Sequence, residues 1–271
     1  MAEDLARFEL PPSRVWARGG ARPVLALHCS LAHAGAWAGL ADALQGVTVT
    51  AIDQIGHGRA ADWDESSDLH AQATAAAVTM AQSIGDGGPV DLFGHSFGGT
   101  VALRVALERP DLVRSLTLVE PVIFAAAKPD ARFAAFAAGH GAFADLVRAG
   151  KRRQAAELFH SQWGTGDSLA DLPERLQSYM VDRIHLIVAQ NPYLVDDAAG
   201  LLRAGGLESV AVPVLLIDGA ESPPVIAAVH DALAARLPQA SRLSVAGAAH
   251  MVSITHAAAV AVAVQAHLDA C

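Results

Sequence analysis

A serine stands between two glycines in the segment Gly94-His95-Ser96-Phe97-Gly98, which has the pattern Gly-x-Ser-x-Gly. The mostly apolar run Val90–Phe93 precedes it and predicts a strand, and the Ala/Leu/Val-rich stretch Thr100–Leu107 follows and predicts a helix. A serine on such a strand-to-helix turn has its hydroxyl pushed out at the sheet edge. The glycines leave room for the neighbouring strand and helix. Ser96 is therefore predicted to be a nucleophile; an ordinary serine in a tight turn is the competing interpretation.

A serine hydroxyl is a weak nucleophile and needs a general base within hydrogen-bond reach. The chain has 12 histidines, so position must select among them. His250 directly follows the last predicted strand, in a loop that opens on the same sheet edge as Ser96, and we predict that it is the base. The histidines less suited by position are His256 at the start of the last helix, His95 inside the turn, His57 in a Gly-His-Gly turn, and His28 at a strand end.

The base needs an acid to orient it, and the chain order Ser, acid, His limits the search to the residues between Ser96 and His250. Glu120 ends the strand that follows the helix after Ser96. A strand–helix–strand unit returns in parallel to a neighbouring position, which puts Glu120 one strand from Ser96. Asp218 and Glu221, after a later strand, are the alternative acids. Glu120 ranks first, and the three remain open.

Acyl transfer also needs two fixed donors for the oxyanion, usually backbone amides. The amide of Phe97 is one candidate because it also benefits from the helix N-terminus. The loop after the first parallel strand, His28-Cys29-Ser30-Leu31, supplies the other, and by position we assign the amide of Ser30. Cys29 itself is a poor alternative nucleophile, since no motif activates its thiol.

Strands alternate with helices along most of the chain, which indicates a mostly parallel sheet. The predicted strands cover residues 23–28, 47–52, 90–93, 112–119, 212–218 and 242–245, and the helices between and after them cover 32–44, 69–84, 100–108, 225–237 and 256–268.

The alternation stops between residues 123 and 207, where only helical patterns occur. These predicted helices cover residues 132–148, 152–163, 172–190 and 193–202. Sheet strands enclose the segment on both sides and no flexible linker separates it. We therefore expect a core made of residues 1–122 and 208–271, with 123–207 inserted as a helical cap; a separate helical domain is the alternative.

Composition bounds the other classes of function. The chain has 271 residues, of which 52% are hydrophobic, and a formal net charge of −9. Its basic triplet Lys151-Arg152-Arg153 is interpreted as a solvated helix face, so neither nucleic acid nor an anionic membrane surface is an expected partner. The charged segment Met1–Arg18 does not have the pattern of a signal peptide, and no apolar run reaches the roughly 20 residues of a membrane span.

The two cysteines, Cys29 and Cys271, do not imply a disulfide framework. We expect a cytoplasmic protein, monomeric or homodimeric, that uses neither a metal nor a cofactor.

Four landmarks occur in order: the loop at His28, the Asp-x-x-Gly-His-Gly segment Asp53–Gly58, the turn Gly94–Gly98, and the Gly-x-x-His loop Gly247–His250. Together they resemble the α/β-hydrolase superfamily over nearly the whole chain. Within it the chain is similar to the cap-bearing esterases, lactonases and carbon–carbon hydrolases. The resemblance implies an α/β-hydrolase fold with helices on both faces of the sheet, an inserted cap, and a Ser-His-acid triad.

The chain departs from the family pattern at two positions. Cys29 stands where members usually carry the glycine of the oxyanion loop, and Ser222 stands where they usually carry the aspartate of Gly-x-x-Asp. Some relatives, including haloalkane dehalogenases, carry their acid where Glu120 stands, which favours Glu120. Dehalogenase activity does not follow, because the dehalogenase nucleophile is an aspartate and this chain has Ser96.

These residues predict a serine hydrolase that cleaves a carboxylic ester or lactone through an acyl-enzyme, with Ser96 attacking, His250 moving the proton and Glu120 orienting His250. The expected substrate is apolar and of modest size. The aromatic residues that could line its pocket, or equally form the core of the cap, are Trp163, Phe133, Phe136, Phe143, Phe159 and Tyr179.

Two other functions fit the same residues. A carbon–carbon bond hydrolase acting on a ring-cleavage metabolite would need a cationic cap residue for a substrate carboxylate, and Arg132, Arg148, Arg152 or Arg183 could serve. A non-catalytic binding protein could keep the hydrolase fold, and the departures at Cys29 and Ser222 are compatible with it. A screen of nitrophenyl esters against a ring-cleavage product distinguishes the carbon–carbon hydrolase from the esterase. A fluorophosphonate probe that fails to label the folded protein would favour the binding protein.

Overall fold

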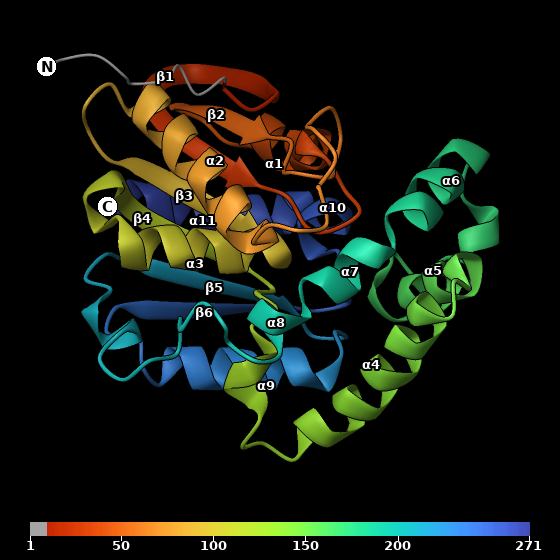
Figure 1. Ribbon diagram of the computed structural model, residues 1–271. Helices are drawn as coiled ribbons and strands as arrows, with labels where there is room; N and C mark the ends of the chain where they lie inside the picture. Colours follow the sequence, from red (N-terminus) through yellow and green to blue (C-terminus); the bar gives the residue numbers. More distant parts are fainter. Residues whose placement is uncertain (1–9) are drawn as a thin grey trace, which may run out of the picture.

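The computed structural model describes residues 10–271, in which a six-stranded sheet forms the centre of the molecule (Figure 1). The strand order is β2-β1-β3-β4-β5-β6. The charged N-terminal residues on which the signal-peptide prediction rests, Glu3, Asp4, Arg7 and Glu9, lie outside the described residues. The strands are β1 (Ser13–Leu27), β2 (Val47–Ile52), β3 (Val90–His95), β4 (Val113–Val119), β5 (Val214–Gly219) and β6 (Ala240–Val245).

The element β1 is longer than the predicted strand and reverses within itself. Residues 13–18 pair with β2 in descending order, whereas residues 23–27 pair with it in ascending order. The reversal occurs near Gly19, which has a φ of 80°. Glycine adopts such a positive φ at little steric cost because it has no Cβ. From Pro23 onward the sheet is parallel, so every following strand carries its C-terminal end to the same edge.

Helices cover both faces of the sheet, as the resemblance implied. On one face α2 (Leu69–Gly85), α3 (Phe97–Glu108) and α9 (Pro224–Ala234) pack in a single hydrophobic cluster with the strands. On the other face α1 (Ala38–Ala43) and α11 (Ala257–Asp269) form a second cluster. The sheet is therefore buried on both sides, which explains the continuous apolar runs of its central strands.

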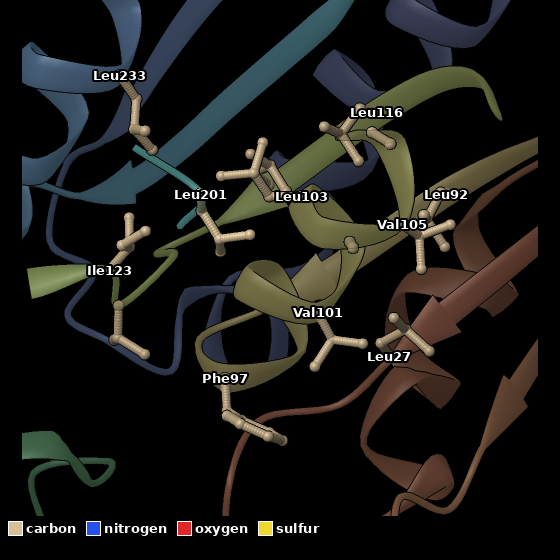
Figure 2. Packing of buried hydrophobic residues seen from close by; sticks show 14 of the residues in the cluster. Leu27, Leu92, Phe97, Val101, Leu103, Val105, Leu116, Ile123, Leu201 and Leu233 are labelled. Carbon is tan, nitrogen blue, oxygen red and sulfur yellow. The ribbon is translucent and has the colours of Figure 1, made fainter. Parts of the chain in front are cut away.

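Helix α3 is the best-buried helix of the core. Its side chains at positions 101 and 105 lie on one face because they are four residues apart. Figure 2 shows Val101 and Val105 beside Leu27, Leu92 and Leu116, which come from three neighbouring strands. This packing fixes the helix that follows Ser96, and with it the direction of the Ser96 turn.

Between β4 and β5 the structure has helices and turns and, among the described residues, no strand. In Figure 1 this segment extends to one side of the sheet. The helices of eight or more residues are α4 (Arg132–Arg148), α5 (Arg152–Trp163) and α6 (Glu174–Arg183), and shorter ones are α7 (His185–Ala189) and α8 (Asn191–Leu194).

The prediction of helices over 172–190 and 193–202 is wrong in detail. The first is divided into α6 and α7 at Ile184, and only α8 overlaps the second. Pro192 stands in the first turn of α8, where its missing amide costs nothing. Asp197 then takes a φ of 52° and accepts hydrogen bonds from the amides of Leu201 and Leu202, at 2.8 and 2.9 Å, which closes a turn in place of a helix.

The remaining predicted elements occur with shifted ends. The predicted helix 32–44 begins instead as a short 3-10 turn before α1. The predicted last helix, 256–268, occurs as α11, and the short helix α10 (Val252–Thr255) before it was not predicted. Within residues 10–271 no helix is both long and apolar enough to cross a membrane. Cys29 and Cys271 are both free thiols.

Gly98 lies where the turn after Ser96 passes the end of β1. A methyl group there would clash with the carbonyl oxygens of Leu27 and His28, which belong to a rigid strand end. We expect Gly98→Ala to lower the free energy of unfolding by about 3 kcal/mol in urea titrations. In the exposed helix α4, Gly141 has open space around it, so Gly141→Ala should raise the same free energy by about 0.5–1 kcal/mol. Equal urea midpoints for Gly98→Ala and the unmodified protein would contradict this account.

Candidate active site

Ser96 connects the end of β3 to the first turn of α3 in a strained conformation. Its φ of 55° and ψ of −118° lie outside the regions that L-residues favour. The amide of Ser96 donates a 2.9 Å hydrogen bond to the carbonyl of Val119, which ties the turn to β4. A Cβ at Gly94 would clash with the backbone of Gly98, so the turn closes only because both positions are glycine. The spacing Gly-x-Ser-x-Gly thus has a steric origin.

Three side chains from the C-terminal ends of three strands form one hydrogen-bonded chain. Nε2 of His250 lies 3.0 Å from Oγ of Ser96, and Nδ1 of His250 lies 2.7 Å from Oε2 of Glu120. All three are nearly inaccessible to solvent, with exposed fractions of 7% for Ser96, 4% for His250 and 0% for Glu120. The structure therefore brings together the residues that the sequence predicts as nucleophile, base and acid.

The Glu120 carboxylate is fully buried and fully hydrogen-bonded. Besides His250, it accepts hydrogen bonds at Oε1 from the amide of Gly219, at 2.7 Å, and from the hydroxyl of Ser222. Burial alone raises the pKa of Glu120, but the donors, His250 foremost, outweigh burial and leave this pKa below its ordinary value. Glu120 is thus a carboxylate at neutral pH. Ser222 occupies the position usual for the acid and donates to the acid that stands elsewhere.

The charge on Glu120 selects the tautomer of His250. A carboxylate 2.7 Å away requires the proton on Nδ1, and Nε2 is then left with a lone pair toward the Ser96 hydroxyl. The backbone of His250 is fixed too, because Nε2 of His95 lies 2.9 Å from the carbonyl oxygen of His250. Nδ1 of His95 lies 3.3 Å from the Ser253 hydroxyl. His95 therefore points away from the Ser96 hydroxyl, as predicted, and positions the His250 loop, which the sequence did not indicate.

The alternative acids do not contact His250. Asp218 is buried behind Glu120, where burial and the Glu120 charge raise the pKa of its carboxyl. Its side chain lies 3.4 Å from the Ser244 hydroxyl and 3.6 Å from Nδ1 of His230. Glu221 is exposed at the surface. Of the three candidate acids, Glu120 is the one within hydrogen-bond distance of the imidazole.

The other candidate histidines have structural contacts. Nε2 of His28 accepts from the amide of Gln54 at 3.0 Å, so its Nδ1 donates to the carbonyl of Cys29 at 2.7 Å. Burial lowers the pKa of His28 to about 3, and the ring stays neutral and clamps the loop that carries Ser30. His57 binds the carbonyl of Ile55 at 2.9 Å, and His256 precedes α11.

One expected oxyanion donor belongs to Phe97, the residue after Ser96, and the other to Ser30, which lines the cavity at Ser96. Phe97 begins α3, where the first amides of a helix have no carbonyl partner within it. Ser30 and Cys29 line the cavity beside Ser96. The Cys29 thiol is buried, and burial raises its pKa to about 12, so it holds no thiolate at neutral pH. Cys29 thus has no support as an alternative nucleophile.

The cavity at Ser96 has a volume of about 50 Å³, and residues of the helical segment form most of its wall. Trp163 packs edge-on against His250, with ring centres 4.8 Å apart. Trp163, Phe136 and Phe159 line the cavity, which is one of the two placements that the sequence left open. Apolar walls of this kind exclude water and strengthen the electrostatic interactions inside.

The other three predicted aromatic residues are not at this cavity. Phe143 is 2% exposed and packs in a separate hydrophobic cluster, and Phe133 is packed against the main core. Tyr179 points elsewhere: its hydroxyl accepts from the amide of Gly58 and donates to the carbonyl of Ala32, both at 2.9 Å. Helical periodicity predicts that these apolar side chains are buried. It does not predict whether they line the cavity or pack in the hydrophobic core.

Gln190 is a cavity residue that sequence reasoning missed. Its Oε1 accepts a 2.8 Å hydrogen bond from the Ser30 hydroxyl, and its Nε2 is buried without a partner among the described residues. His140 also reaches the cavity and binds Asn191 at 2.7 Å. Gln190 follows the end of α7, and nothing in the local sequence indicates that its side chain faces the cavity. Its position there follows from the fold.

A family model described as alpha/beta hydrolase fold matches residues 22–257. The chain belongs to the α/β-hydrolase family. The matched range contains all three members of the hydrogen-bonded chain and both ends of the helical segment.

Individual relatives share parts of this α/β hydrolase. A lipase of Mycobacterium tuberculosis, Lipase LipV, is 38% identical over 119 residues, 43% of this chain and 43% of its own. The match thus spans less than half the length of that curated relative. A solved hydrolase of Pseudomonas aeruginosa covers 94% of this chain and 93% of its own with a TM-score of 0.74 at 20% identity. A solved thermophilic esterase covers 93% and 91% with a TM-score of 0.66 at 23% identity.

The lowered pKa of Glu120 predicts a pH-dependent contribution to stability. A carboxyl whose folded pKa lies below its unfolded value stabilises the fold at pH above the unfolded value, here near 4.5, and loses that contribution as the pH falls through the folded pKa. Glu120→Gln should therefore lower the free energy of unfolding by about 1–3 kcal/mol at pH 7, and the difference should shrink below pH ~4.5. Urea titrations from pH 3 to 8 measure it.

Glu221→Gln is the matched control, since it removes one carboxyl from the surface of the same loop region. A difference between the unmodified protein and Glu120→Gln that stays constant across the pH series would contradict an ionised Glu120.

Proposed function

We propose that this α/β hydrolase is a serine esterase that cleaves carboxylic esters, lactones included, through an acyl-enzyme. The observation that carries the proposal is the unbroken hydrogen-bonded chain from Ser96 through His250 to the ionised Glu120. The same order of groups activates serine in unrelated hydrolases. The relatives described above include a lipase and an esterase, which supports ester cleavage.

In the proposed reaction, Oγ of Ser96 attacks the ester carbonyl while Nε2 of His250 takes the hydroxyl proton. The imidazolium that forms lies beside the Glu120 carboxylate, which stabilises its charge without taking its proton. His250 then gives the proton to the leaving alcohol, and an acyl-Ser96 remains. Water enters, His250 takes one of its protons, and the same steps release the acid.

The negative charge that develops on the carbonyl oxygen needs donors already in place. We assign the amides of Phe97 and Ser30, the first at the positive end of the α3 dipole. The clamp of His28 on the Cys29 carbonyl supports the second assignment, because it fixes the backbone next to Ser30 even though position 29 is not glycine. The unpartnered Nε2 of Gln190 is a further donor that a bound substrate can satisfy.

The size of the cavity supports a short acyl group. A volume of about 50 Å³ is roughly a third of the ~150 Å³ of an engineered cavity that binds benzene. Residues 123–207 supply most of its apolar wall, through Phe136, Phe159, Trp163 and Leu194 among others. We therefore propose that this helical segment acts as the cap and sets the chain length of the substrate.

The contacts of the arginines favour an ester over a carbon–carbon substrate. Arg132 binds Asp130 and Asp231, and Arg148 binds Asp145. Arg152 and Arg183 line clefts other than the cavity at Ser96. None of the four lines that cavity within the described residues, so the carboxylate partner that a ring-cleavage product needs is absent there.

Removing each member of the chain should lower the turnover of nitrophenyl butanoate. We expect Ser96→Ala and His250→Ala to lower kcat by at least about 10³-fold, and Glu120→Gln to lower it by about 10²–10⁴-fold because the tautomer of His250 is no longer fixed. Initial rates measured on variants with unchanged circular dichroism spectra test this. Ser96→Ala should also lose labelling by a fluorophosphonate probe.

Asp218→Asn and Glu221→Gln are the matched controls for the acid and should keep kcat within about threefold. Full activity in Ser96→Ala would refute the nucleophile. An unlabelled and inactive but folded wild type would favour the binding-protein alternative.

Phe136 closes the cavity wall by stacking on Phe124, with ring centres 4.0 Å apart. Phe136→Ala should therefore enlarge the acyl site and shift the preferred nitrophenyl ester to a longer chain, with kcat/KM for the octanoate rising about tenfold relative to the butanoate. Phe133→Ala, a partly buried neighbour that does not line the cavity, is the control. An unchanged chain-length profile in Phe136→Ala would show that the cavity does not hold the acyl group.

A further inference from the structure

A second, larger cleft of about 710 Å³ lies between α6 and the loops around β1 and β2. Four arginines line it, namely Arg14, Arg59, Arg175 and Arg183. The whole chain has 19 lysines and arginines against 28 acidic residues, so a gathering of four arginines in one cleft runs against the overall charge. Of the described residues that line this arginine cleft, Asp53 is the one carboxylate.

Asp53 does not neutralise the cleft. Its carboxylate accepts hydrogen bonds from the amides of Ala34, at 2.7 Å, and Arg59, at 3.0 Å, and lies 3.5 Å from Nε of Arg59. These donors, together with the nearby positive charge, outweigh burial and lower the pKa of Asp53. Asp53 and Arg59 therefore balance each other and leave the other three arginines uncompensated within the cleft.

Arg183 is fixed in place by neutral groups. Its Nε donates to the carbonyl of Gly56 at 3.1 Å, and its guanidinium lies 4.1 Å from the ring centre of Tyr179. Within residues 10–271, Arg14, Arg175 and Arg183 form no ion pair with a carboxylate. Guanidinium groups ordered in this way bind carboxylate and phosphate well, because little side-chain freedom remains to be lost.

An apolar groove of about 360 Å³ lies between the arginine cleft and the cavity at Ser96 and shares lining residues with both. The groove shares His33 and Leu176 with the cleft. At its other end it shares Ser30, Trp163 and Met251 with the cavity. An elongated molecule that extended from Ser96 to the arginines would lie along this apolar groove.

The groove borders the cavity at Met251, a residue that lines both. Met251 directly follows His250, which protonates the alcohol in the proposed reaction. The cavity at Ser96 itself holds about 50 Å³, which is too small for a long chain. The long part of the substrate is therefore its alcohol.

We propose that the substrates are esters of a short acyl group with an elongated, apolar alcohol that ends in a carboxylate or phosphate, and that the arginine cleft binds this anionic end. The proposal rests on the proposed esterase activity. It explains why an acidic protein keeps three uncompensated guanidinium groups beside a groove that borders the cavity of its nucleophile.

Three butanoate esters test it, made from ω-hydroxyoctanoic acid, ω-hydroxyoctyl phosphate and the neutral ω-hydroxyoctanamide. Titration of the released acid gives kcat/KM for each. We expect at least one anionic ester to exceed the amide by about tenfold, through a lower KM, and the preference to weaken in high salt. Comparison of the two anions identifies carboxylate or phosphate as the natural end group.

The double variant Arg14→Gln with Arg175→Gln should reduce that preference to about twofold or less while leaving hydrolysis of the amide unchanged. Arg109→Gln is the matched control: Arg109 follows the far end of α3, whose 12 residues extend about 18 Å from Ser96. Arg183 is left intact, since it also positions Gly56 and Tyr179.

Equal kcat/KM for anionic and neutral esters in the wild type would overturn the proposal, as would an equal loss of preference in Arg109→Gln. Hydrolysis of nitrophenyl butanoate distinguishes a failure of the arginine-cleft proposal from a failure of the esterase proposal. If it persists while the three long esters react alike or are not cleaved, the arginine cleft is not a substrate site and the esterase stands. If it is absent too, the esterase proposal itself fails.

Discussion

The buried negative charge of Glu120 is the constraint on which the rest of the site depends. An isolated carboxylate without solvent would be very costly, so the fold must supply donors for both of its oxygens. They come from three separate places: His250 after β6, the amide of Gly219 at the end of β5, and the Ser222 hydroxyl. The charge thereby links three strand ends, and the imidazole is oriented because the carboxylate requires its proton. A parallel sheet brings such strand ends together at one edge, which explains why the site lies there.

The nucleophile turn is the second constraint, and it has a steric origin. Ser96 holds an unfavourable backbone conformation, and Glu120 has a positive φ of 48° as well. Both are tied to the neighbouring strand, Ser96 through the carbonyl of Val119 and Glu120 through that of Ile217. The strain is tolerated because the packing of α3 on the sheet fixes the direction of the chain after Ser96. The missing Cβ atoms of Gly94 and Gly98 allow the close backbone contacts that this turn requires.

The sequence was sufficient for the sheet, for the family, and for bringing Ser96, His250 and Glu120 to one edge, because each follows a strand and parallel strands end together. Helices within the segment 123–207 were less predictable: periodicity gave their apolar character, but Pro192 and the turn at Asp197 set their ends. Side-chain direction was beyond reach. Nothing in the order of residues tells that Phe136 lines the cavity while Phe143 is buried elsewhere, or that Gln190 meets Ser30, since these contacts join segments far apart in the chain.

The arginine cleft is another feature that the order of residues does not reveal. The chain has a net charge of −9 and no basic run beyond one surface triplet, but neither fact says anything about arginines that lie far apart in sequence. Folding brings Arg14 on β1 next to Arg175 and Arg183 on α6. The local potential in a cleft depends on the few groups that line it, since more distant charges are screened within about 8–10 Å of solvent. The acidic exterior and the cationic cleft are therefore compatible, and an anion that enters the cleft is attracted by nearby arginines while distant surface carboxylates are screened.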